Sequence, residues 1–205
     1  MERIKILSPL SGIQEIKTFS RLSGMQWIRT LSLWSGVLGF LVVALGAWTR
    51  LADAGLGCPD WPGCYGFVTI PVSPEEIDIA NAKFPDTPYE VAKAIPEVVH
   101  RYFAAALGFM ILCIAFLAFR YKDLPSDVRK LSFFLIAWVI MQGTFGYWTV
   151  SLKLWPQVVT THLMSGFLTT GLLWLLYFKT KDHLQNRTTW NLGQPQRSYS
   201  MSLSY

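Results

Sequence analysis

The chain has 205 residues, of which 52% are hydrophobic and 15% aromatic. Its net charge is +5, and its 18 basic and 13 acidic residues are gathered into a few segments between long apolar runs. This composition is typical of a membrane protein and excludes a soluble domain as the main body of the chain. The basic residues follow the expected topology, described below, so we expect no binding to nucleic acid.

Four apolar runs are long enough to cross about 30 Å of hydrocarbon as helices at about 1.5 Å per residue. The sequence therefore predicts an all-α, polytopic membrane protein whose four-transmembrane-helix bundle covers residues 31–178. The predicted spans are residues 31–49, 98–119, 131–150 and 158–178. A polar extension, an outer loop and a polar tail complete the chain at residues 1–30, 50–97 and 179–205.

The first span is expected to stay in the mature protein. It starts only after thirty mostly polar residues, and no small-residue cleavage site follows it, so it does not resemble a signal peptide. The extension before it is interpreted as an ordinary cytoplasmic segment, with an amphipathic helix on the membrane surface as the alternative.

Lysine and arginine predict the orientation. Five of them precede the first span, four lie between the second and third spans, and four follow the fourth span. Basic residues concentrate on the cytoplasmic side. We therefore expect a bacterial-type inner membrane location, in the lipid bilayer, with the N- and C-termini both cytoplasmic.

The outer loop opens with a turn rich in glycine and proline that contains Cys58 and Cys64. Two cysteines separated by five residues can form a disulfide in an oxidising compartment. A structural disulfide and a redox-active pair both remain open, because a redox role requires an exposed thiol of low pKa. Zinc is not expected, since the loop offers neither histidine nor a third cysteine. The rest of the loop is expected to have little regular structure.

Three ionisable residues, Glu97, His100 and Arg101, stand at the mouth of the second span. Such groups at the edge of hydrocarbon are costly and by default mark a functional site. On a helix, residues three and four apart share one face, so these side chains lie together. Pro96 just before them is predicted to be the first residue of the helix.

His162 stands about five residues inside the fourth span and His100 about four inside the second. Both spans run inward from the outer side, so the two imidazoles are expected at matched depth, facing each other across the bundle. A flat macrocycle with two axial imidazoles, which is haem, is the natural occupant. Its propionates would face outward and pair with Arg101, Arg50 or Lys153. A bare metal would need a third ligand, for which Glu97 is the nearby candidate.

Gln142 in the third span needs a polar partner inside the bundle. Packing is its favoured role there, together with Gly143 and Gly146, and lining of a pocket is the alternative.

In these residues the chain resembles the haem A synthase family, from about residue 35 to residue 178. The matching positions are Thr49, Arg50, Leu51, Gly55, Leu56, Cys58, Pro59, Asp60, Trp61, Pro62, Cys64, Gly66, Glu97, His100, Arg101, Gln142, Gly143, Gly146, Thr149, Val150, Pro156, Val159 and His162.

The resemblance implies an enzyme of cytochrome oxidase biogenesis that oxidises the C8 methyl group of haem O to a formyl group, giving haem A. It implies His100 and His162 as axial ligands of the haem iron and Glu97 as the acid/base group near the reacting methyl. Cys58 and Cys64 match the family's outer-loop pair, for which electron or haem transfer has been considered. Haem O synthase and cytochrome oxidase assembly factors are expected as partners.

Family members usually have eight spans in two homologous four-helix halves, and the second half holds haem b. This chain resembles the N-terminal half only. We therefore expect it to work as a homo-oligomer or beside a separately encoded second half, with haem B as another group that the histidines can hold.

Two other classes remain open. A bis-histidine haem-binding subunit for electron transfer or haem delivery would use His100 and His162 without any need for Glu97. A four-span thiol oxidoreductase would use Cys58 and Cys64 but usually needs a second outer cysteine pair, which the short turn at residues 151–156 does not contain.

Overall fold

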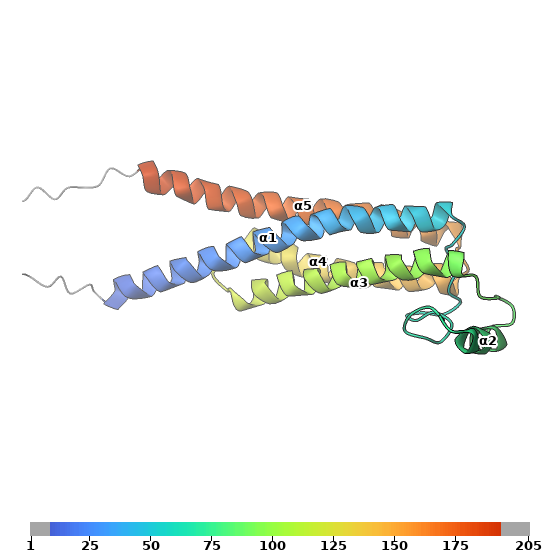
Figure 1. Cartoon of the computed structure of the whole chain (residues 1–205). Helices are drawn as coiled ribbons and strands as arrows, with labels where there is room; N and C mark the ends of the chain where they lie inside the picture. The colour runs from blue at the N-terminus through green and yellow to red at the C-terminus, as the bar shows by residue number, and fades with distance from the viewer. Residues whose placement is uncertain (1–8, 194–205) are drawn as a thin grey trace, which may run out of the picture.

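The computed structural model describes residues 9–193, with side chains described from residue 20 to residue 186. The predicted features in residues 1–8 and 194–205 lie outside the described residues. The helices are α1 (Pro9–Leu51), α2 (Pro74–Lys83), α3 (Val91–Arg120), α4 (Ser126–Ser151) and α5 (Pro156–Gly193) (Figure 1). The described part of the chain contains no β-strand, and the prediction of an all-α protein is confirmed.

The four long helices form a ring in which each helix contacts two neighbours. α1 packs against α3 and α5, and α4 also packs against α3 and α5. Within residues 9–193, the backbones of α3 and α5 do not approach each other closely, and neither do those of α1 and α4. α3 and α5 therefore stand on opposite corners and face each other across the centre. The end of the bundle that carries α2 is called the outer end here (Figure 1).

All four long helices are long and apolar enough to span a membrane, over Ser20–Leu51, Val91–Arg120, Ser126–Ser151 and Pro156–Asn186. Many of their large apolar side chains point away from the bundle, for example Phe109, Phe116 and Ile140, which are 66%, 63% and 66% exposed. Such a surface is stable only against hydrocarbon, because in water it would form an extensive exposed apolar patch. The chain is therefore a membrane protein with four transmembrane helices.

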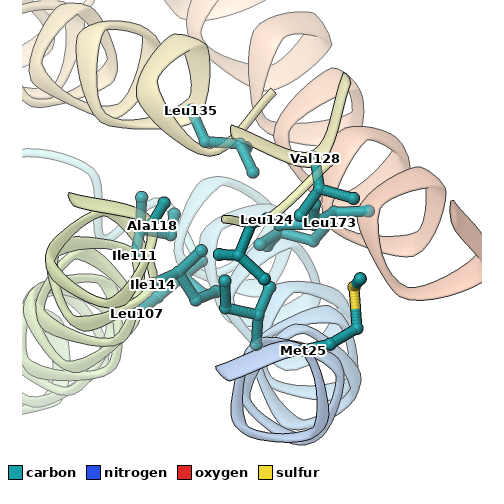
Figure 2. Packing of buried hydrophobic residues seen from close by; sticks show 11 residues of the cluster. Met25, Leu107, Ile111, Ile114, Ala118, Leu124, Val128, Leu135 and Leu173 are labelled. Carbon is teal, nitrogen blue, oxygen red and sulfur yellow. The ribbon is translucent and has the colours of Figure 1, made fainter. Parts of the chain in front are cut away.

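Buried apolar side chains from all four long helices pack together in a core (Figure 2). By residue number, this core lies in the inner half of the bundle. Its outermost buried members are Leu107 on α3, Leu135 on α4 and Leu173 on α5. His100 lies seven residues outward of Leu107, which is about two helical turns. The histidines therefore lie in the half of the bundle that the large buried side chains of this core do not fill.

α2 lies within the outer loop, so the prediction of little regular structure after the cysteine turn is wrong for Pro74–Lys83. A capping box starts this helix: Ser73 Oγ accepts the Glu76 N–H at 3.2 Å, and the Glu76 carboxylate accepts the Ser73 N–H at 3.0 Å. Pro74 occupies the first turn, where its missing N–H costs nothing. The Ser-x-x-Glu pattern is a readable helix-start signal.

Two helix starts also differ from the predicted ones. α3 begins at Val91, so the prediction that Pro96 is the first helical residue is wrong, and Pro96 lies inside the helix. A proline there has no N–H to offer the Ala92 carbonyl but still adopts helical φ. α1 begins at Pro9 and runs without a break into the first span, so residues 9–30 form no separate surface helix.

Candidate functional site

The structure brings His100 and His162 to the same level of the bundle. α1 contacts both α3 and α5, so the depths of residues on these two helices can be compared along it. Gly46 of α1 lies against His100, and Val43 of α1 lies against Gly166 of α5. Gly46 is three residues outward of Val43, and His162 is four residues outward of Gly166. At about 1.5 Å per residue, the two histidines differ in depth by only about 1.5 Å.

Each imidazole lies against a glycine of a neighbouring helix. A Cβ at Gly46 of α1 would come within 2.9 Å of His100 Cε1, which real side chains essentially never do. A Cβ at Gly146 of α4 would lie 3.6 Å from His162 Cε1, an ordinary contact. The absence of a side chain at position 46 therefore makes the space for the His100 ring, and this contact was not predicted.

Both imidazoles keep a buried nitrogen without a hydrogen-bond partner. The Nδ1 atoms of His100 and His162 are inaccessible to solvent and have no partner among the described residues. A buried polar atom left unpaired costs free energy, so such an atom indicates a missing ligand or partner. Imidazole nitrogens on two opposite helices fit the axial positions of a haem iron. Within residues 20–186 no three His, Cys, Asp or Glu side chains converge, so no multi-ligand site for a bare metal is formed.

A polar network lies directly inward of His162. Ser165 Oγ donates to Gln142 Oε1 at 3.0 Å, and the Gln142 amide lies 3.4 Å from Thr169 Oγ1. Trp138 Nε1 also donates to Thr169 Oγ1, at 3.1 Å. Gln142 therefore has the polar partners inside the bundle that were expected for it. These side chains join α4 to α5 on the inner side of His162.

Glu97 is buried one turn outward of His100, with 5% of its surface exposed. Its Oε2 accepts the backbone N–H of Cys58 at 3.0 Å, and its Oε1 forms an ion pair with Arg101 on the same helix. The Glu97 carboxylate is therefore bound both to Arg101 on its own helix and to the outer loop.

Arg101 has partners that the sequence did not suggest. Besides Glu97, its guanidinium donates to the backbone carbonyls of Asp60, at 2.9 Å, and Gly63. Arg50 and Lys153, the other cations considered for haem propionates, are exposed at the outer end. In this structure the guanidinium of Arg101 is thus engaged with Glu97 and the loop.

Cys58 and Cys64 form a disulfide, and both residues are fully buried. They lie in a small core with Tyr65, Ala80 of α2 and Ala94 of α3. Burial in this core raises the pKa of the Tyr65 phenol above its usual value.

Asp60 closes the turn between the two cysteines. Its carboxylate accepts the N–H of Tyr65 at 2.6 Å and of Gly66 at 2.7 Å. Gly66 has φ +84°, a left-handed conformation that favours glycine. In the sequence, Asp60 was recognisable only as part of the family pattern, although aspartate in a turn commonly accepts such backbone hydrogen bonds.

The fold and this site define a four-helix membrane protein with paired histidines in its outer half. The chain belongs to the COX15-CtaA family, described as cytochrome oxidase assembly protein, which matches residues 29–204. The heme A synthase of Shewanella oneidensis is 48% identical over 145 residues, which cover 71% of this chain and 43% of that protein. The chain therefore spans less than half the length of this relative. No solved structure matches it.

Proposed function

We propose that this chain performs haem A synthase-type oxidation, converting the C8 methyl group of haem O to a formyl group for cytochrome oxidase biogenesis. The observation that carries the proposal is the pair of buried histidines at one depth on opposite helices, with a buried carboxylate one turn from one of them. Membership of the cytochrome oxidase assembly family and the similarity to a heme A synthase support it.

His100 and His162 are proposed to bind the iron of haem O as axial ligands, each through one imidazole nitrogen. The bound iron supplies the redox chemistry that amino-acid side chains lack. The two imidazoles come from opposite corners of the bundle and would hold the flat macrocycle between them. The exposed cations Arg50 and Lys153 at the outer end are proposed to pair with the propionates.

Glu97 is the proposed acid/base residue. Conversion of a methyl group and one water molecule to a formyl group releases four protons and four electrons. A carboxylate next to the reacting carbon can accept a proton or orient the water. Glu97 is buried, adjacent to a proposed ligand and fixed at both oxygens, so its carboxylate is held in a defined place.

The membrane orientation is proposed from the distribution of basic residues, and the partners are proposed from the family resemblance. The excess of basic residues on one side of the spans supports cytoplasmic termini and a disulfide loop on the outer side. The chain covers 43% of the relative, and a second copy of this chain or a separately encoded half is a proposed partner. Haem O synthase and oxidase assembly factors are the proposed neighbours.

The test is to purify the protein in detergent, extract its porphyrins and identify them by mass, for wild type and Glu97→Gln. The proposal predicts haem O together with its hydroxylated or formyl product in wild type, and haem O alone in the variant. Haem B alone in both proteins would contradict the proposed enzyme and favour a bis-histidine carrier.

A further inference from the structure

The Glu97 carboxylate joins α3 to a part of the loop that is 39 residues away in sequence. Oε2 accepts the N–H of Cys58 at 3.0 Å. Hydrogen bonds to an ionised carboxylate are about twice as strong as neutral ones. The loop backbone therefore fixes the direction of this side chain.

Arg101 completes a closed set of contacts. It binds the second oxygen of Glu97, and it also donates to the Asp60 and Gly63 carbonyls of the same loop. The loop thus donates a hydrogen bond to the carboxylate of this buried ion pair and accepts hydrogen bonds from its guanidinium. A shift of the loop would displace both partners of the pair together.

The Cys58–Cys64 disulfide closes the loop that makes these contacts, and it is shielded from solvent. Cys58 and Cys64 are 0% exposed, covered by the small core that includes Tyr65, Ala80 and Ala94. Thiol–disulfide exchange requires a thiolate to reach a sulfur atom, so reactive disulfides are accessible. This burial favours a structural bond and argues against an exchange partner.

Gly57 allows the loop to approach α3. A Cβ at this position would lie 2.2 Å from the Lys93 carbonyl oxygen and 2.8 Å from the Ala94 nitrogen, both of which are backbone atoms. Backbone cannot move aside as a flexible side chain can. A side chain at position 57 would therefore push the loop, and with it the Cys58 N–H, away from Glu97.

We propose that the disulfide loop, residues 57–64, is the positioning element for the Glu97 carboxylate, and that the Cys58–Cys64 bond serves this mechanical role without carrying electrons to or from the substrate. Gly57, Cys58 and Arg101 are then positioning residues. The inference rests on the proposed function, in which Glu97 acts beside the reacting methyl.

The first test is Gly57→Ala, which retains both cysteines and every titratable group. We expect kcat for haem O oxidation to fall at least about tenfold, since small misplacements of reacting groups have large effects on rate. KM should stay within about twofold of the wild-type value, and the low-spin haem spectrum should be unchanged. Gly108→Ala on α3 is the control, because a Cβ there meets nothing within 4 Å. An electron-carrying disulfide predicts an unchanged kcat in Gly57→Ala, and that result would overturn the proposal.

The second test does not depend on turnover. Hydrogen exchange of the loop backbone, followed by mass spectrometry, is compared in wild type, Glu97→Gln and Glu97→Ala. The Gln amide oxygen still accepts the Cys58 N–H, whereas Ala leaves it unpaired. We expect the 57–64 segment to exchange about tenfold faster in Glu97→Ala and close to wild type in Glu97→Gln. Equal exchange in all three proteins would overturn the coupling. A wild type that shows this exchange pattern but does not oxidise haem O would refute the proposed function alone.

Discussion

Gly46 of α1 lies against the imidazole of His100, so closely that a Cβ there would come within 2.9 Å of Cε1. The α1 backbone is therefore one wall of the space that holds a proposed iron ligand. The position of His100 depends on a residue that has no side chain and lies in another helix.

The Gly46→Ala variant should disturb the haem site. The added methyl group forces the His100 ring to turn or shift, and changes that misorient a metal-ligating histidine typically reduce affinity about 10–100-fold. We expect weaker haem binding and a partial loss of the low-spin spectrum, measured by titrating the purified protein with haem. Gly171→Ala on α5, where a Cβ meets nothing within 4 Å, is the matched control and should bind as wild type does. Equal affinities in both variants would show that this contact does not position the ligand.

Gln142→Leu should reduce stability while leaving the helices intact. Gln142 bonds Ser165 and Thr169 of α5, and such interhelical hydrogen bonds in membranes contribute about 0.5–1.5 kcal/mol. The free energy of unfolding in detergent, measured by denaturant titration, should fall by about that amount. Thr144→Val, at an exposed position on α4, should have a smaller effect. Stability that drops equally in the two variants would refute a special role for the network.

The capping box of α2 predicts a pH dependence in the outer loop. Hydrogen bonds from the Val72 and Ser73 N–H groups hold the pKa of Glu76 below its usual value of 4.5. A carboxylate whose folded pKa is lowered stabilises the fold above its unfolded pKa, and this stabilisation is lost as the pH falls through the folded pKa. Exchange protection factors in Pro74–Lys83 should therefore fall below about pH 4.5. Glu76→Ala should lose this dependence, and Glu75→Ala should keep it.

The spans were predictable because apolar length alone identifies a transmembrane helix, and the similar depth of His100 and His162 followed from counting inward from the predicted outer ends. The disulfide followed from spacing and compartment. The start of α2 carried a readable Ser73-x-x-Glu76 signal that the proline-rich context concealed.

Other features depend on tertiary contacts that no local pattern encodes. The partners of Arg101 are backbone carbonyls about forty residues earlier, and a backbone carbonyl has no sequence signature. The requirement for glycine at positions 46 and 57 likewise comes from atoms of other segments, the His100 ring and the Lys93 carbonyl. Such contacts become visible only when the helices are placed in space.

The most direct measurement of the central claim is the absorption and electron paramagnetic resonance spectrum of the purified protein loaded with haem, for wild type, His100→Ala, His162→Ala and His183→Ala. His183 lies near the inner end of α5, where it contacts Asp127, and is the matched control. We expect a low-spin, bis-histidine spectrum in wild type and His183→Ala, and its loss in each of the other two variants. A low-spin spectrum that survives in His100→Ala or His162→Ala would contradict the paired-histidine site.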